Sequence, residues 1–278
     1  MFGARDYAAE FFGTALLLLV GLSGVCLILS THSPVFSPLS DDRLRRLLIG
    51  VVFGTTLALI IYSPLGRRSG GHMNPAVTLA FWRLGKIDAA ATSLYIAAQL
   101  GGALTGTAVV ALIWRGWADS VHLGATVPRD TTTGSAVLAF VLEFVMVFLL
   151  ATLILNCVNR PRLMPYTGVA VGLLIVALVF FVAPVSGASL NPVRTLGPAV
   201  IGSRYWAVWL YLLAPPLGAL AAALVFASGH AKVACGKLFH PVGGRCQFID
   251  CQYMPPEERI PPPVHRRHRI DLRERTSK

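Results

Sequence analysis

Residues 69–76 read Ser-Gly-Gly-His-Met-Asn-Pro-Ala, and residues 186–194 read Ser-Gly-Ala-Ser-Leu-Asn-Pro-Val-Arg. Both stretches begin with Ser-Gly and contain Asn-Pro followed by an apolar residue. Each comes after an apolar segment of membrane length and begins a shorter apolar run. Two matched Asn-Pro pairs, one in each half of the chain, predict two half-helices that meet inside a bilayer and form a pore.

The composition is that of a membrane protein. Of the 278 residues, 55% are hydrophobic and only 13% are charged, whereas soluble domains carry about 25% charged residues. A hydrocarbon core of about 30 Å requires roughly 20 helical residues. Because the apolar runs are continuous and do not alternate, they favour helices over a β-barrel. We therefore predict an all-α membrane protein with six transmembrane helices, over about 7–30, 47–63, 89–114, 135–158, 163–183 and 205–228.

An internal repeat orders these segments. Ala9-Glu10-Phe11 in the first span matches Leu142-Glu143-Phe144 in the fourth. The repeats cover about residues 1–115 and 130–230 of a channel domain at 1–230. Three spans per repeat, an odd number, make the repeats run in opposite directions, which places a functional site near the membrane midplane.

The runs that begin at each Asn-Pro pair are too short to span. Residues 74–83 and 191–201 would each form a helix of roughly 15 Å, about half the hydrocarbon thickness. If they enter from opposite faces as re-entrant half-helices, the two together make one further transmembrane element.

The residue types suit this meeting point. Asparagine is a preferred N-cap, and proline is favoured at the next position, where its missing donor costs nothing. The amide groups of Asn74 and Asn191 would then face the lumen, and both helix N-termini would direct positive partial charge at its centre. Such a centre predicts exclusion of protons and cations and passage of neutral solutes.

Glu10 and Glu143 are the acids deepest in the predicted spans. Acids within a membrane are costly and are usually paired or functional. One interpretation is proton coupling. The other is that each carboxylate accepts backbone N–H groups of a re-entrant loop, and the repeat symmetry favours this second interpretation.

Positive charges predict the orientation. The net charge is +11, and ten of the 24 lysines and arginines follow residue 228, which favours contact with anionic lipid over nucleic acid. The larger set of positive charges predicts that both termini are cytoplasmic, in a multi-pass protein of the cell membrane. This set contains Arg5, Arg67, Arg68, Arg83, Lys86, Arg160, Arg162 and the tail. The opposite side holds Arg43, Arg45, Arg46, Arg115, Arg129 and Arg204, offset by Asp41, Asp42, Asp119 and Asp130.

The tail at residues 231–278 has a different composition. It is basic and rich in proline, which predicts disorder. Four potential metal ligands lie within 17 residues: Cys235, His240, Cys246 and Cys251. Their spacings do not fit the usual C-x₂₋₄-C pattern of zinc sites. We therefore favour reduced, unliganded cysteines and expect no metal or other cofactor.

The chain resembles the aquaporin (major intrinsic protein) family over about residues 5–230. The resemblance rests on the paired motifs Asn74-Pro75-Ala76 and Asn191-Pro192-Val193. It implies six spans, two half-helices, a pore in each protomer and a homotetramer. Valine at position 193 replaces the usual alanine and is expected to make the centre slightly bulkier on one side.

The resemblance also implies an outer constriction of four residues. Matching positions are Phe53, Val179, Ala188 and Arg194. Water-selective members are expected to carry histidine, and glycerol facilitators glycine, at the position of Val179. Residues 184–189, 196–198 and 211–212 look like the nodulin-26-like branch, which implies passage of water and small neutral solutes such as glycerol, urea or metalloid acids.

Other functions stay open at this point. A water-only channel is the nearest alternative, and a coupled secondary transporter, which also uses broken helices, is a further one. A structural or adhesive protein with an occluded pore is a third. An enzyme is disfavoured, since no nucleophile, metal or nucleotide motif appears in the sequence.

Overall fold

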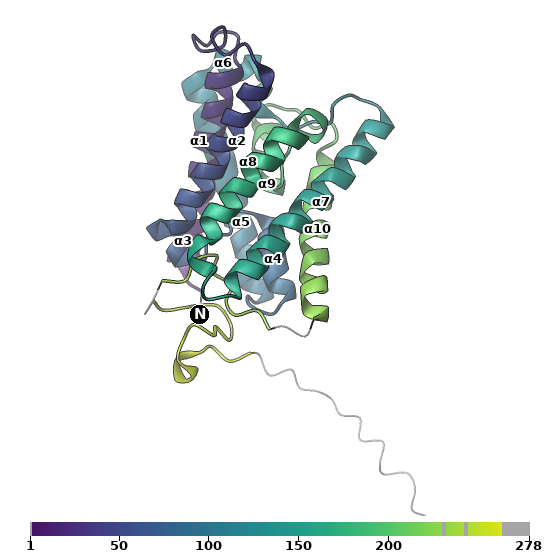
Figure 1. The fold of residues 1–278 in the computed structure, drawn as a ribbon. Helices are drawn as coiled ribbons and strands as arrows, with labels where there is room; N and C mark the ends of the chain where they lie inside the picture. Colours follow the sequence, from purple (N-terminus) through teal and green to yellow (C-terminus); the bar gives the residue numbers. More distant parts are fainter. Residues whose placement is uncertain (1, 230–231, 242–243, 263–278) are drawn as a thin grey trace, which may run out of the picture.

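Six helices of membrane length form the body of the protein (Figure 1). The structure is a computed structural model that describes residues 2–229, 232–241 and 244–262. The six helices confirm the spans expected from the sequence. They are α1 (Ala4–Leu29), α2 (Asp42–Tyr62), α5 (Ala89–Trp114), α7 (Thr133–Val158), α8 (Thr167–Ser186) and α10 (Val208–Ser228).

Two half-helices complete the membrane part. They are α4 (Pro75–Arg83), with nine residues, and α9 (Pro192–Ile201), with ten. Both begin at the proline of an Asn-Pro pair. Four short helices lie in connections: α3 (Pro64–Ser69), α6 (Gly116–Ser120), η1 (His122–Gly124) and η2 (Met164–Tyr166). A fifth, η3 (Pro256–Glu258), lies in the tail.

The helix packing follows the inverted repeat. Helix α1 packs on α5 in the first half, and α7 packs on α10 in the second. The halves meet where α2 packs on α8. Each half-helix packs against the last span of the opposite half, α4 on α10 and α9 on α5. The two Asn-Pro helix starts are thereby held between both halves of the chain.

Helix α2 is longer than the hydropathy pattern predicts, because polar contacts extend it. It begins at Asp42, five residues before the predicted start, and the Asp41 carboxylate accepts the N–H of Arg43 at 2.7 Å. Arg45 pairs with Asp42 at 2.9 Å and stacks on the ring of Phe36 at 3.9 Å. The arginines at 43–46 oppose the predicted orientation, and one of them, Arg45, is therefore paired with neighbouring residues.

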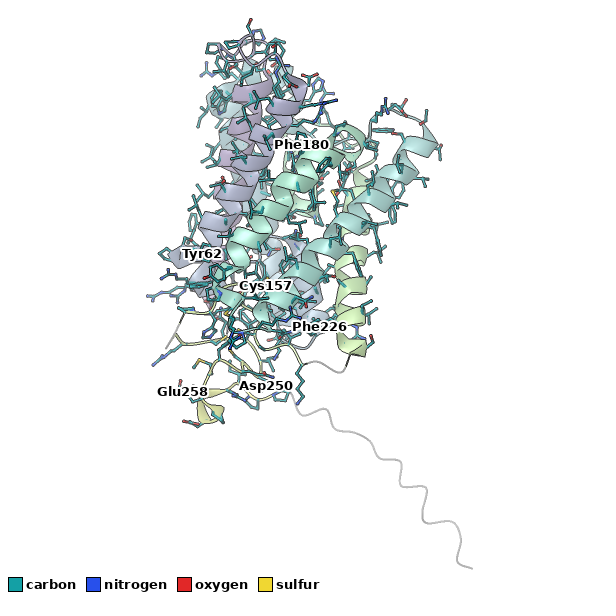
Figure 2. The ribbon with its side chains drawn as sticks, viewed as in Figure 1. Tyr62, Cys157, Phe180, Phe226, Asp250 and Glu258 are labelled. Atoms are coloured by element: carbon teal, nitrogen blue, oxygen red, sulfur yellow. The ribbon has the colours of Figure 1, made fainter. Side chains whose placement is uncertain are left out.

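The described part of the tail is packed against one end of the bundle, which we call the tail end. In Figure 2, Asp250 and Glu258 lie beyond the helix ends marked by Tyr62, Cys157 and Phe226, and Figure 1 places the N-terminus at this same end. The hydroxyl of Tyr253 donates to the carbonyl of Val158 at 2.8 Å.

This packing differs from the disorder expected for residues 231–278. The described segments 232–241 and 244–262 bury Val233, Leu238 and Phe248, because the apolar residues dispersed among the prolines and charges pack on the helix bundle. The remaining residues of the predicted disordered segment, including the basic run at 265–269, lie outside the described part of the chain.

Glycine sets the spacing between α2 and α8. A Cβ atom added to Gly54 would overlap the carbonyl oxygen of Gly172, and one added to Gly172 would lie 2.8 Å from the carbonyl oxygen of Gly54. The helices therefore approach through bare backbone, as small residues allow in membranes.

We predict that Gly54→Ala lowers stability because its methyl group must push α8 away, at a cost of about 1–3 kcal/mol. Gly134→Ala in α7 is the matched control, since an added Cβ at that position meets no atom of the described residues within 4 Å. Thermal unfolding in detergent measures both. A melting temperature unchanged in Gly54→Ala would contradict the close contact.

Candidate pore at the half-helix junction

Asn74 and Asn191 cap the two half-helices. The Asn74 side-chain oxygen accepts the backbone N–H of Ala76 at 2.9 Å, and the Asn191 oxygen accepts that of Val193 at 3.1 Å. Each asparagine adopts an extended backbone conformation, after which proline starts the helix. The local preferences of Asn and Pro thus determine where both half-helices begin.

The two asparagines also join the half-helices to each other. The side-chain amide of Asn74 donates to the carbonyl of Leu190 at 2.9 Å, and that of Asn191 donates to the carbonyl of Met73 at 2.8 Å. Each acceptor directly precedes the opposite asparagine. Because an amide carries two N–H bonds, each Asn retains a second donor for the lumen.

The loops that precede the half-helices are held by the two buried glutamates. Glu10 accepts the backbone N–H groups of His72 at 3.1 Å and Met73 at 2.8 Å. Glu143 accepts those of Ser189 and Leu190, both at 2.8 Å. Both carboxylates lie where the sequence repeat places them and satisfy backbone that no helix satisfies.

These glutamate contacts offset backbone strain. Met73 and Leu190 have positive φ angles of 45° and 57°. A residue with a side chain in this region costs about 1–3 kcal/mol and persists where its surroundings fix it. The paired N–H bonds to each carboxylate supply that constraint in both halves.

Further polar side chains surround each glutamate. In the first half, Gln99 donates to Glu10 at 2.7 Å and to the hydroxyl of Thr78 at 3.0 Å. In the second half, the hydroxyl of Ser186 donates to Glu143 at 2.9 Å. Thr78 has an equivalent in Thr195, four residues after the second asparagine, and Thr195 lies 2.6 Å from the hydroxyl of Ser189.

The four residues expected at the constriction all line one cavity, and two of them are in contact. The guanidinium carbon of Arg194 lies 5.3 Å from the centre of the Phe53 ring, and Arg194 donates to the carbonyl of Gly124 at 2.7 Å. Phe53, Val179, Ala188 and Arg194 line the same cavity. Only Arg194 among the four has a charged side chain.

That cavity has a volume of about 340 Å³ and extends to both sides of the asparagine pair. Its lining is mainly aliphatic and includes equivalent residues of the two halves, such as Leu17 and Leu150. Polar residues occur at a few levels: Arg46 near the start of α2, Arg194 near the constriction, Asn74, Ser189 and Asn191 at the centre, and His72 toward the tail end.

The other residues of the Asn-Pro motifs do not face this cavity. Pro75, Ala76, Pro192 and Val193 are buried but are absent from its lining. Val193, which the sequence comparison expected to make the centre bulkier, is 2% exposed and is not among the residues that line the cavity.

Several residues of the site were not anticipated from the sequence. His72 is buried and stacks on Phe81 with ring centres 4.9 Å apart. Tyr95 donates to the carbonyl of Ser69, and Tyr211 donates to that of Ser186. The internal repeat gave a signal for the two tyrosines, because their acceptors, Ser69 and Ser186, are the equivalent first residues of the two Asn-Pro stretches. Leu238 of the tail, which also lines the cavity, gave no such signal.

Comparison with known proteins agrees with this geometry. The model of the major intrinsic protein family matches residues 2–226. Nodulin-26 of Glycine max is 37% identical over 179 residues, an alignment that covers 64% of each chain. Aquaporin NIP1-3 of Oryza sativa is 33% identical and covers 80% of this chain and 73% of its own; aquaporin NIP1-1 of Arabidopsis thaliana is 35% identical, with coverages of 78% and 71%.

The fold has a solved counterpart as well. The aquaglyceroporin from Plasmodium falciparum superposes with a TM-score of 0.66 at 23% identity, covering 80% of this chain and 94% of its own. Six spans, two Asn-capped half-helices and a cavity at their junction thus occur together with the match of the family model. The chain belongs to the major intrinsic protein family, whose members are multi-pass membrane channels for water and small solutes and not enzymes.

Proposed function

We propose that this protein conducts water and small neutral solutes passively and excludes protons and ions. The observation that carries the proposal is the lining of the cavity. The lining is mainly apolar, and its polar residues are few: Arg46, Arg194, Ser189, His72 and the two asparagines. A neutral molecule can exchange water for these few partners, whereas an ion loses more hydration than they replace.

The half-helix starts account for the exclusion of cations. A helix N-terminus carries roughly half a positive elementary charge, and α4 and α9 both begin at the cavity centre. A cation or a migrating proton at this point meets positive potential from two sides. The free N–H of each asparagine also requires a passing water to present its oxygen, which interrupts a proton relay.

The solute class follows from the constriction. Val179 provides an apolar wall where a histidine would add a donor and a ring. A small polyhydroxy compound, urea or an uncharged metalloid acid can bind Arg194 through its oxygens and place its remaining surface on Phe53 and Val179. We therefore include glycerol, urea and metalloid acids among the permeating solutes, in addition to water.

The occupied glutamates favour passive flux over coupled transport. Glu10 and Glu143 each accept two backbone N–H groups and a side-chain donor. Protonation would remove acceptors that the loops need, so neither acid is suited to cycling its proton. A coupled transporter would lose its flux when a protonophore collapses the proton gradient, and a passive channel would not.

We further propose a homotetramer in the cell membrane with the tail end in the cytoplasm. The bias of positive residues supports this orientation. Large apolar side chains such as Leu112 and Phe181, each 73% exposed in the single chain, lie on the outer face of the bundle. Lipid and neighbouring protomers can both cover such a face.

The substrate range can be tested with proteoliposomes. We predict osmotic swelling with water and with at least one of glycerol, urea and boric acid. Val179→His should suppress the solute while water still passes, because the imidazole narrows the opening and adds a donor. Val179→Ala, which keeps the wall apolar, is the control and should retain solute flux. Passage of water alone in the wild type would favour the water-only alternative.

Arg194→Val tests the charge barrier at the constriction. A unit charge about 5 Å from a permeating cation costs about 3 kcal/mol at an effective dielectric constant of about 20. We therefore expect proton or cation leakage to rise about tenfold or more in voltage-clamped membranes. The control is Arg129→Val, an exposed arginine outside the cavity lining. Equal leakage in both variants would show that Arg194 does not contribute to the barrier.

A further inference from the structure

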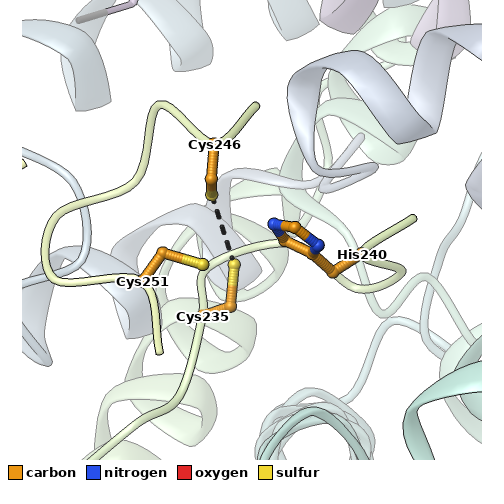
Figure 3. Close-up of side chains that lie close together, drawn as sticks. All are labelled: Cys235, His240, Cys246 and Cys251. Carbon is orange, nitrogen blue, oxygen red and sulfur yellow. Dashed lines mark hydrogen bonds between the residues drawn. The ribbon is translucent and has the colours of Figure 1, made fainter. Parts of the chain in front are cut away.

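Four metal-ligating side chains from the tail converge at the tail end of the bundle (Figure 3). One ligand atom from each of Cys235, His240, Cys246 and Cys251 lies within 4.8 Å of all the others, and all four residues are buried. The sulfur atoms of Cys235 and Cys246 are 3.5 Å apart. In a tetrahedral zinc–thiolate site, with Zn–S bonds of about 2.3 Å, neighbouring sulfurs lie about 3.8 Å apart.

The imidazole of His240 is arranged like a metal ligand. Its Nδ1 lies 3.0 Å from the carbonyl oxygen of Pro241, which can only accept, so Nδ1 carries the proton. The other ring nitrogen, Nε2, is buried and has no hydrogen-bond partner among the residues that the structure describes. Metal-binding histidines typically donate one N–H to a carbonyl and coordinate through the other nitrogen. A bound ion would satisfy this orphaned atom.

Two buried lysines near the cluster also favour a bound metal ion. Lys86 and Lys237 are both buried, with exposed fractions of only 4% and 2%. Their hydrogen-bond partners in the described part of the chain are all backbone carbonyl oxygens, at 2.8–3.2 Å. Buried charges are normally paired with opposite charge. Three thiolates, a neutral imidazole and Zn²⁺ sum to −1, which would supply a counter-charge.

The cluster also lies beside the pore. Gly236 and Leu238, between the first two ligands in the chain, contact the loop that precedes α4. The Leu238 N–H donates to the carbonyl of Gly70 at 2.9 Å, and Nε2 of His72 lies 2.9 Å from the carbonyl oxygen of Gly236. Since His72 and Leu238 both line the cavity, the tail forms part of the wall at this mouth of the pore.

We propose that Cys235, His240, Cys246 and Cys251 bind one Zn²⁺, and that this ion fixes the tail across the mouth of the pore. Thiolate and imidazole ligands in a closed four-ligand set are typical of structural zinc. Because short segments with few apolar residues fold poorly alone, metal binding supplies the free energy that orders the tail. Fixed in this position, the tail restricts flux through that mouth.

A disulfide is the competing chemistry for this cluster. Joining two of the three cysteines would require an oxidant and would leave the third thiol and Nε2 of His240 without a ligand. A reducing cytoplasm, where we place the tail end, keeps such thiols reduced. The intact mass under non-reducing conditions separates the two cases, since a disulfide lowers it by about two mass units per bond through loss of two hydrogens.

Metal analysis of the purified full-length protein is the direct test. We expect about one zinc per chain in the wild type and in Cys157→Ser, whose buried thiol lies outside the cluster. Cys246→Ser and His240→Ala should lose the zinc. His240→Cys should retain it, because four cysteines also bind zinc, which separates loss of a ligand from failure to fold. Zinc below about a tenth of an equivalent in the wild type, or a disulfide in its place, would overturn the site.

Two further readouts test the role of the ion. A zinc chelator should increase hydrogen exchange in residues 232–241 and 244–254 and leave α5 unchanged; unchanged tail exchange after loss of zinc would overturn the anchoring. In the wild type, water permeability should rise about twofold or more after chelation. In Cys246→Ser, which is expected to hold no zinc, the chelator should leave water permeability unchanged. This last readout rests on the proposed channel function. Unaltered permeability despite zinc loss would overturn the restriction, whereas no permeability in any state would instead reject the channel.

Discussion

The crossed hydrogen bonds between Asn74 and the carbonyl of Leu190, and between Asn191 and the carbonyl of Met73, are the contacts on which the rest of the structure depends. They join two half-helices that have no covalent connection near the midplane. Without this junction, two helix N-termini and two non-helical loops would meet in a low-dielectric interior with unsatisfied donors and acceptors. Such groups are costly in a membrane, which is why the loops are tied at several points.

The two buried glutamates support this junction by fixing the loops that precede the half-helices. Glu10 and Glu143 hold the loops, and the loops present Met73 and Leu190 in the left-handed conformation that aims their carbonyls at the opposite asparagine. Each half thus supplies the acceptors for the other half. This reciprocity explains why the motif occurs twice, since a single half-helix would leave its asparagine without an acceptor.

Local chemistry made much of this arrangement predictable. Asn-Pro fixes a helix start, hydropathy fixes the six spans, and the odd number of spans fixes the inverted orientation. The acceptors of the asparagine amides were not predictable, because Met73 and Leu190 become neighbours only through the tertiary fold. The early start of α2 at Asp42 was missed for a different reason: capping and arginine stacking override a hydropathy boundary.

The tail shows where composition misleads. Prolines and positive charges in residues 231–278 indicate a segment unable to form a core of its own, and the described part instead packs on the channel. Cys235 and Cys251 are 16 positions apart in the sequence, yet their ligand atoms lie within 4.8 Å of each other because the chain turns back on itself. No ligand spacing rule describes that turn, so the sequence identified the four potential ligands but favoured unliganded cysteines.

The central claim is that the asparagine junction passes neutral molecules and stops protons. The most direct measurement imposes an osmotic gradient and a pH gradient together on vesicles containing the wild-type protein and follows light scattering and internal pH at once. The account predicts volume changes several times faster than in empty vesicles, with internal pH relaxing at the empty-vesicle rate. Proton entry that rises with water flux, or volume changes no faster than in empty vesicles, would contradict it.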